Sequence, residues 1–325
     1  MQPTFNEVIN QVEKLLSNNS EWNDRYGEYA KTIINNLSQI QRKKKLFHEW
    51  APLFLYMNIS NAKGKMDFHL RYHGQDVAIL KTDNSSAKIS TKTFDKKNLR
   101  DFNCNIKLDN SNWRSKEATK FREYFSSNPK RSKTAGKGNE EHRIESLLLT
   151  ELSKKKSQNK IFCGIQPVKI GGFSRFQMPT PIKASKIDKL SYSGKYGGGI
   201  DILARVGKGK GTKLCIMEIK DENTSKEPPM KVILQGIAYA TFIHELLRST
   251  KGELWWKIFG FKGKLPEALE INVACGMPLS TNPQLNDKNF ALKKISIPNY
   301  KKDSLILHYF YFDKNITSVD TSFFE

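Results

Sequence analysis

The first part of the chain has apolar residues at helical spacing. Phe5, Val8 and Val12 begin a stripe that predicts a helix over residues 5–16. A second stripe, made of Tyr, Ile and Leu, predicts a longer helix over residues 22–47.

Between residues 65 and 102 the pattern changes to alternation, as in MDFHLRYHGQDVAILKT. Alternation predicts strands with two different faces, and HGQD and DNSS supply turns, so we expect a small antiparallel sheet. A helix is predicted over residues 115–125, and residues 128–139 have the Pro, Gly and Lys content of a linker. The sequence thus predicts an N-terminal α+β domain over residues 1–130 and a second domain over residues 139–325.

The second domain begins with a strongly periodic helix, for which Asn139 is the expected N-cap. Apolar runs predict three strands after it, then a long helix and further strands. This order predicts an α/β fold with a mixed sheet flanked by helices. The expected elements are strands over residues 160–168, 199–206 and 213–220, a helix over residues 229–248, and strands in the runs ALEINVACGM, KKISIP and LILHYFYF.

Basic residues are in large excess over the 325 residues, with 54 Lys and Arg against 33 Asp and Glu and a formal net charge of +21. Such an excess favours nucleic acid over an acidic protein or a membrane surface as the partner. The run RKKK at residues 42–45 either suits the negative end of its helix or contacts phosphates. The predicted strands also carry cations, which either bind a nucleic-acid backbone or protect strand edges from pairing: Arg71, Lys81, Lys88 and Lys92.

The four cysteines lie far apart and lack the spacing of a metal site, which is typical of reduced, buried thiols. The first residues contain no basic region followed by a long apolar run, and no apolar run is long enough to span a membrane. We therefore expect a cytoplasmic protein without a signal peptide or a membrane partner.

The stretch GGGIDILARVGKGKGTKLCIMEIK, residues 197–220, places three polar residues at the ends of two short apolar runs. Asp201 begins the first run, and Glu218 and Lys220 end the second. If the runs are adjacent antiparallel strands, these side chains converge, and Glu218 and Lys220 share one face of the sheet. Two carboxylates and a lysine in this arrangement suit Mg²⁺ or Mn²⁺, whereas an exposed Glu218–Lys220 salt bridge is the simpler alternative.

The motifs GGGID, MEIK and QGIAY together resemble the PD-(D/E)xK nuclease superfamily, most closely its RecB-like branch. In that branch a GxxD element ends in a metal-binding Asp, a (D/E)xK element supplies a second carboxylate and a lysine, and QxxxY lies on the next helix. The resemblance covers roughly residues 139–247 and implies a restriction-endonuclease-like fold for the second domain. The matching positions here are Asp201, Glu218, Lys220, Gln235 and Tyr239.

The resemblance also implies a glutamate on the upstream helix that helps to bind the metal. Glu141 and Glu145 both fit, because each lies on the face of that helix that carries leucines, and spacing does not choose between them. The backbone carbonyl of Ile219 is a further metal ligand by the same resemblance. Gln235 and Tyr239, four residues apart, share a helix face and are implied to line the site. Alternatively, Tyr239 packs in the core and Gln235 satisfies a backbone group.

We therefore expect a Mg²⁺- or Mn²⁺-dependent nuclease that hydrolyses DNA phosphodiester bonds, an endonuclease rather than an exonuclease, in restriction, defence or repair. One site per chain makes a homodimer attractive for cutting both strands. A first alternative is a non-catalytic nucleic-acid-binding or assembly module that keeps the fold. A second is a nuclease that acts on RNA, although the sequence has no aromatic RNA-binding motif.

Overall fold

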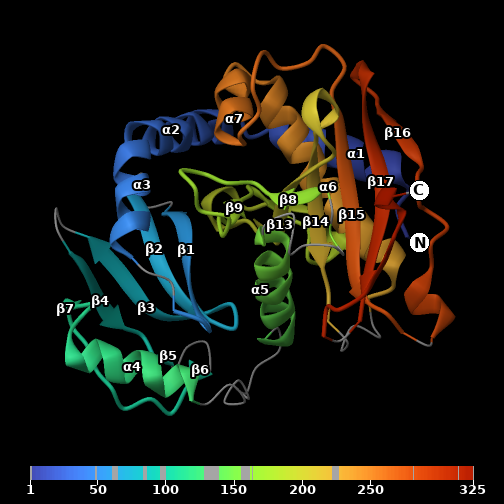
Figure 1. Cartoon of the computed structure of the whole chain (residues 1–325). Coiled ribbons are helices and arrows are strands. Elements are labelled where there is room, and N and C mark those ends of the chain that lie inside the picture. Colours follow the sequence, from blue (N-terminus) through green and yellow to red (C-terminus); the bar gives the residue numbers. More distant parts are fainter. Residues whose placement is uncertain are drawn as a thin grey trace. The chain divides into compact units, whose positions relative to one another are not determined.

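The computed structural model of the chain contains two compact units, and each is described by itself (Figure 1). The first unit comprises Met1–Lys31, Leu148–Val168 and Gln177–Glu325, and the second comprises Thr32–Leu147 and Lys169–Phe176. The predicted linker lies outside the described residues except for Asn139, so the predicted domain boundary stays a prediction. The structure describes residues 2–47, 50–60, 65–82, 86–95, 100–127, 139–154, 162, 164–221, 227–280, 282–313 and 315–324.

A mixed seven-stranded sheet forms the centre of the first unit. Its strands are β8 (Ile165–Pro167), β13 (Ile202–Val206), β14 (Lys213–Ile219), β15 (Glu270–Pro278), β16 (Lys294–Ile297), β17 (Tyr300–Phe312) and β18 (Val319–Thr321). They follow the order β16–β17–β15–β14–β13–β8, with β18 also paired to β17. Strand β15 runs parallel to β14 and β17, and the other pairs are antiparallel. The predicted α/β fold with a mixed sheet is confirmed.

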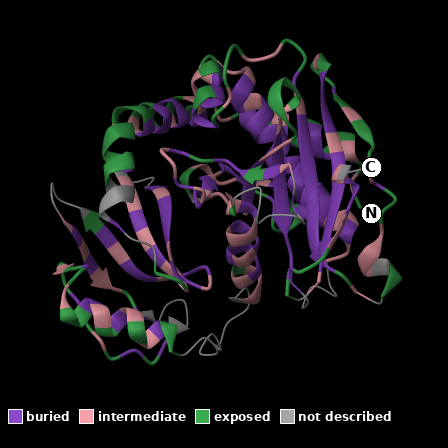
Figure 2. Ribbon diagram, viewed as in Figure 1, coloured by how far each residue is buried: buried purple, intermediate pink, exposed green. Residues whose placement is uncertain are grey.

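The central strands are buried along almost their whole length, as the purple ribbons of Figure 2 show. In β14 every residue from Leu214 to Ile219 is buried, and the apolar run that predicted this strand is typical of one covered on both faces. Glu218 is therefore a charged residue inside the most buried part of the sheet. Its position needs an explanation other than packing.

Helix α6 (Pro229–Arg248) covers the sheet and packs against β14, β15 and β17. It begins with a proline in its first turn, where a missing amide hydrogen costs nothing, and the predicted helix over residues 229–248 is confirmed. Helix α1 (Phe5–Ser17) packs on α6 and β16, and it begins with a capping box between Thr4 and Glu7. Helix α7 (Gly252–Ile258) also packs on α6.

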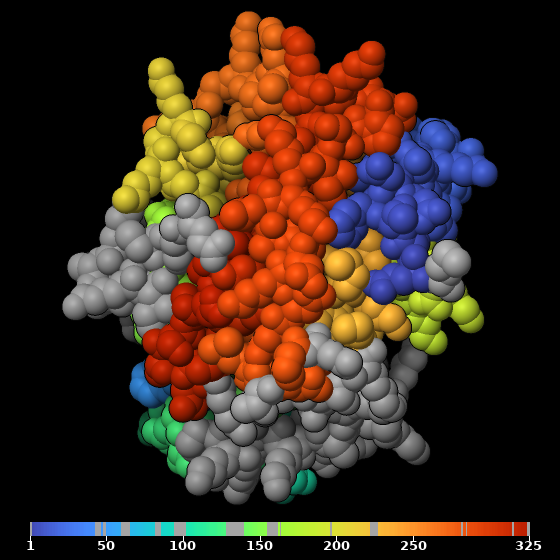
Figure 3. All heavy atoms as spheres, turned by 90° about the vertical axis from the view of Figure 1, so that its right-hand side faces the viewer, coloured from blue at the N-terminus to red at the C-terminus, as the bar shows by residue number. Residues whose placement is uncertain are grey.

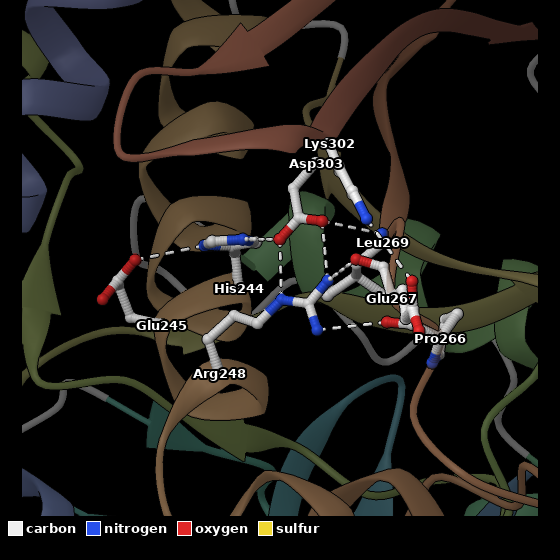
Figure 4. Close-up of polar contacts among 8 residues, drawn as sticks. All are labelled: His244, Glu245, Arg248, Pro266, Glu267, Leu269, Lys302 and Asp303. Carbon is white, nitrogen blue, oxygen red and sulfur yellow. Dashed lines mark hydrogen bonds and ion pairs between the residues drawn. The ribbon is translucent and has the colours of Figure 1, made fainter.

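A buried ionic network fixes the end of α6 to the sheet (Figure 4). The Asp303 carboxylate of β17 accepts hydrogen bonds from Arg248 Nε at 2.6 Å, Arg248 Nη2 at 2.6 Å and the backbone amide of Leu269 at 2.8 Å. His244 Nε2 lies 2.8 Å from the same carboxylate. Because Asp303 is only 2% exposed, these contacts are what make a charge tolerable there, and they anchor the helix that carries Gln235.

The second unit contains a five-stranded antiparallel sheet in the order β1–β2–β3–β4–β7. These strands are β1 (Leu53–Ser60), β2 (Lys65–Tyr72), β3 (Gln75–Thr82), β4 (Ala87–Thr91) and β7 (Ser111–Asn112). The predicted turn between β2 and β3 is confirmed: His73 and Gly74 both have positive φ, as a tight two-residue hairpin requires. The predicted DNSS turn comprises residues 83–86, and residues 83–85 lie outside the described part of the chain. The sheet also contains β1, which alternation did not predict.

The predicted helix over residues 22–47 is wrong in one respect. It is two helices, α2 (Glu21–Asn35) and α3 (Leu37–Leu46), interrupted at Asn36. The predicted helix at residues 115–125 is confirmed as α4 (Lys116–Ser126), with Ser115 as its N-cap. Helix α5 (Asn139–Ser153) begins at Asn139 itself. None of the helices in the described ranges combines the length and apolar character that crossing a bilayer requires.

Short strands complete the structure. In the first unit these are β9 (Met178–Pro179), β10 (Ile182–Lys183), β11 (Ser191–Tyr192) and β12 (Gly199–Ile200), and in the second they are β5 (Phe94–Asp95) and β6 (Arg100–Asp101). The pairing of β9 with β12 matters for function, because β12 leads directly into Asp201.

Candidate active site

Strand pairing brings Asp201 next to the end of β14. In the antiparallel pair β13–β14, Ile202 lies opposite Met217, so Asp201 precedes this pair on one strand and Glu218 follows it on the other. The Asp201 Oδ2 atom accepts a hydrogen bond of 2.8 Å from the backbone amide of Ile219. The predicted pairing of the two apolar runs is confirmed, and the turn GKGKG joins them as expected.

Glu218 and Lys220 form a buried ion pair. Lys220 Nζ lies 3.1 Å from Glu218 Oε1, and the two side chains are only 8% and 6% exposed. The alternative of an exposed surface salt bridge is therefore wrong. Removing two charges from water costs more than such a pair usually returns, so buried charges of this kind are typical of functional sites.

Helix α6 lies against the face of the sheet that carries Glu218. It approaches closely at Gly236, where a Cβ atom would lie 2.8 Å from Val273 Cγ1 and 3.9 Å from Glu218 Cβ. Next to this contact, Gln235 is only 2% exposed, and its Oε1 atom has no hydrogen-bond partner among the described residues. A buried amide oxygen without a partner is costly, and it is a group for a ligand or a water to satisfy.

The phenol of Tyr239 lies near the charged side chains of Glu218, Asp201 and Lys220. Burial raises the pKa of Tyr239 well above its ordinary value, and the nearby carboxylates of Glu218 and Asp201 raise it further. A hydrogen bond with the backbone of Ala184 and the charge of Lys220 act in the opposite direction. The phenol therefore stays protonated at neutral pH and can donate a hydrogen bond beside the carboxylates. Four of the motif residues, Asp201, Glu218, Lys220 and Tyr239, are thus close to one another, and Gln235 lies one turn before Tyr239 on the same helix.

Cys275 is a neighbour of this site that the sequence did not reveal. It lies opposite Glu218 in the parallel pair β14–β15. Burial raises the pKa of its thiol well above the ordinary value; Lys220 lowers this pKa and Glu218 raises it. The thiol is therefore uncharged and unreactive, and it gives the site an apolar wall. No sequence signal identifies Cys275, since the parallel partner of a strand cannot be read from local pattern.

The glycines before Asp201 allow a loop to pass close to it. A Cβ atom at Gly197 would overlap the backbone carbonyl of Thr180, and one at Gly198 would lie 2.7 Å from the Tyr239 hydroxyl. Only glycine permits these approaches, so the GGG run positions the loop that bears β9 and the amide of Ala184. The segment of residues 178–184, which contains β9 and Ala184, therefore lies beside the glycines that lead into Asp201.

Replacing Gly197 with Ala is expected to destabilise the first unit by about 1–3 kcal/mol, because the methyl group meets backbone that cannot rotate away. Thermal unfolding followed by circular dichroism measures the change. Gly211→Ala is the matched control, since a Cβ there meets nothing within 4 Å. Equal melting temperatures for the two variants would contradict the close approach at Gly197.

The glutamates predicted to assist the metal belong to the second unit. Glu141 and Glu145 both precede the point in α5 at which the first unit resumes, at Leu148. The Glu145 side chain is 6% exposed and its Oε2 atom lies 3.6 Å from His142 Nδ1. Since the two units are described separately, a role for either glutamate beside Asp201 stays a prediction.

The cations predicted to form a basic surface on the second unit differ in their surroundings. Arg71 is not an exposed cation: its Nε donates to Asp76 at 2.7 Å, and its guanidinium lies 4.4 Å from the Tyr56 ring. Lys81 and Lys88 lie directly opposite each other on β3 and β4. Like charges in such a pair repel, so an anion there would be stabilising. The side chains of residues 43–45 lie outside the described part of the structure.

The side chains at this site supply only some of the ligands that a divalent cation needs, so water and substrate would have to supply the rest. Among the described residues, no group of three or more His, Cys, Asp and Glu side chains is placed to hold a metal. Asp201 and Glu218 supply two carboxylates, and Mg²⁺ commonly takes one or two of these and completes its shell with water and substrate oxygens. The donor set therefore fits Mg²⁺ or Mn²⁺.

Comparison with protein-family models, with curated proteins and with solved structures found no match.

Proposed function

We propose that this protein is a metal-dependent nuclease that hydrolyses phosphodiester bonds in DNA, and that its first unit has a restriction-endonuclease-like fold. The observation that carries the proposal is the group formed by the half-buried Asp201 and the buried Glu218 and Lys220 at the ends of paired strands. A buried lysine paired with a carboxylate has little value for stability, and it is well suited to phosphoryl chemistry.

Each residue has a role in the proposed reaction. Asp201 and Glu218, with the carbonyl of Ile219, would hold Mg²⁺ or Mn²⁺, and water and phosphate oxygens would complete its shell. The bound ion would supply Lewis-acid activation and lower the pKa of a water molecule. Lys220 would orient the attacking water and offset the charge that grows on the phosphate oxygens. No covalent intermediate is needed: water forms the new P–O bond and loses a proton to solvent, and the leaving oxygen departs with the bonding electrons and takes up a proton from solvent.

Two residues of α6 would position the substrate. The protonated phenol of Tyr239 would donate a hydrogen bond to a phosphate oxygen or to water, as its raised pKa allows. The Gln235 carbonyl oxygen would accept a hydrogen bond from the attacking water. The role of Tyr239 is supported by its place near Glu218 and Asp201, and that of Gln235 by its buried oxygen without a partner among the described residues.

The net charge of +21 supports nucleic acid as the substrate, and DNA is the form we propose. One such site per chain makes an endonuclease that acts as a homodimer the arrangement suited to cutting both strands. A nucleic-acid-binding module without catalysis is the second candidate, because the large basic excess would serve it equally well.

Incubation of plasmid, linear duplex, single-stranded DNA and RNA with Mg²⁺ or with EDTA tests the proposal. The wild type is expected to cut DNA only with Mg²⁺, and Lys220→Ala to cut it about 10²-fold more slowly, because the charge that offsets the transition state is lost. Binding without metal-dependent cutting of any substrate would favour the module. Cutting by Lys220→Ala at the wild-type rate would show that the chemistry lies elsewhere.

A further inference from the structure

Two lysine-rich turns adjoin at the end of the first-unit sheet that lies away from Glu218. One is the turn between β13 and β14, in the run RVGKGKGTK of residues 205–213, and the other follows α7, in the run KIFGFKGK of residues 257–264. Arg205 joins them, because its Nη1 donates a hydrogen bond of 2.9 Å to the carbonyl of Gly260. In Figures 1 and 3 the yellow turn and neighbouring orange segments project at the same upper end of this unit.

Neither run contains an acidic residue. Lys213, at the start of β14, is already neutralised by Glu270, which also pairs with Lys294. The remaining lysines are all exposed, and they have no ion pair or hydrogen bond from their side chains among the described residues. We call these five residues the basic end: Lys208, Lys210, Lys257, Lys262 and Lys264.

The backbone of the basic end is held in place and is open to solvent. Trp256 and Phe261 stack with their ring centroids 3.8 Å apart, which fixes the second turn against α7. Gly209 and Gly263 have positive φ, and a Cβ atom at either position would meet nothing within 4 Å. Neighbouring lysines on fixed, open turns repel one another, and a polyanion removes this repulsion.

We propose that the basic end binds the phosphate backbone of the nucleic-acid substrate, as a second contact site remote from the catalytic residues. This inference rests on the proposed function only in taking nucleic acid as the partner. Strand β14 separates the two sites, and its seven residues span roughly 20 Å. That distance corresponds to about six base pairs of duplex at one base pair per ~3.4 Å. A substrate must therefore extend about that far from the scissile phosphate to reach both sites.

The test measures the affinity of full-length protein for a long DNA duplex by fluorescence anisotropy in EDTA, at several salt concentrations. Reversing two charges, in Lys208→Glu/Lys210→Glu, is expected to weaken binding and to lower the slope of log K against log salt by about 2, since each phosphate contact contributes about 0.9. The matched control is Lys14→Glu/Lys293→Glu, which changes the net charge equally at two exposed positions near the other edge of the sheet. Its slope is expected to stay close to that of the wild type.

Equal effects of the two double variants would overturn the inference, because they would mean that only net charge matters. Absence of binding by the wild type would overturn it as well. Cleavage in Mg²⁺ is measured on the same proteins and reports separately on the proposed function. A protein that binds through the basic end and never cuts supports the inference and contradicts the nuclease. A protein that cuts DNA, and whose binding does not depend on Lys208 and Lys210, supports the nuclease and contradicts the inference.

Discussion

Glu218→Gln is expected to reduce metal-dependent DNA cleavage by about 10³-fold, the upper range for removal of one electrostatic contact to a transition state. The substitution keeps the shape of the side chain and removes one of the two carboxylate charges that would hold the cation. It also removes the ion-pair partner of Lys220, at 3.1 Å. Initial rates on plasmid DNA at several Mg²⁺ concentrations give the loss and show whether excess metal restores activity.

Metal binding by itself supplies the independent measurement. Mg²⁺ is expected to raise the melting temperature of the wild type, because a ligand that binds only the folded state stabilises it, and to have no such effect on Glu218→Gln. Glu267→Gln is the control, since that side chain is 91% exposed, and it should behave as the wild type in both assays. A Glu218→Gln variant that is still stabilised by Mg²⁺ and still cuts DNA at full rate would remove Glu218 from the site.

Asp303→Asn is expected to lower the free energy of unfolding of the first unit by about 3 kcal/mol, because it leaves Arg248 and His244 beside a neutral group in a buried place. The carboxylate accepts two hydrogen bonds of 2.6 Å from Arg248 and one of 2.8 Å from the amide of Leu269, and Asn cannot accept all of them (Figure 4). Urea unfolding followed by tryptophan fluorescence measures the loss, since Trp255 and Trp256 lie in the same unit.

The pH dependence of this loss identifies its cause. Burial alone would raise the pKa of Asp303, but the hydrogen bonds from Arg248, Leu269 and His244 outweigh it and hold the pKa below its usual value. A carboxyl whose pKa is lower in the folded state stabilises the fold fully above the pKa of the unfolded chain, about 3.9, and loses this contribution as the pH falls through the folded value. The gap between wild type and Asp303→Asn should therefore be constant near neutral pH and shrink below about pH 4.

Asp320→Asn is the matched control for Asp303. Its carboxylate pairs with Lys288 at the surface, where both side chains are more than 40% exposed, so its loss should be below about 1 kcal/mol. A pH-independent gap for Asp303→Asn, or equal losses for the two variants, would show that the buried charge has no special role.

The local sequence pattern was sufficient to predict the helix and the strands that carry the motifs. The long apolar periodicity of α6 and its proline start fixed its bounds, and the short apolar run from Leu214 to Met217 identified β14. The pairing of β13 with β14 followed from the glycine turn between them, and it made the convergence of Asp201, Glu218 and Lys220 predictable. A short, local hairpin is the kind of contact that sequence specifies best.

Elements that depend on distant partners were not predictable in this way. Strand β1 has the sequence LFLYMNIS, whose apolar residues are too continuous to show alternation, and only its pairing with β2 identifies it as a strand. The break at Asn36 interrupts a continuous apolar stripe, which gave no sign of it. The neighbour Cys275 reaches Glu218 through parallel pairing, for which adjacent sequence carries no information.

The sequence could not select between Glu141 and Glu145 for the same reason. Both lie on α5 about one turn apart, so helical geometry gives them nearly the same direction, and only the tertiary position of the helix can select one. Glu145 is the more buried of the two in the second unit. Burial alone does not assign it to the metal, because its neighbours there include Tyr56 and His142.

The interrupted course of the first unit determines how this protein can be divided. Val8, Ile9, Val12 and Leu16 of α1 are buried, and α1 packs against α6, which bears Gln235 and Tyr239. A fragment that starts at residue 139 would keep the motif residues from Asp201 to Tyr239 and still leave the side of α6 that α1 covers open to water. A fragment confined to the first unit would have to rejoin residue 31 to residue 148 and residue 168 to residue 177, so truncation from the amino terminus alone cannot isolate this unit.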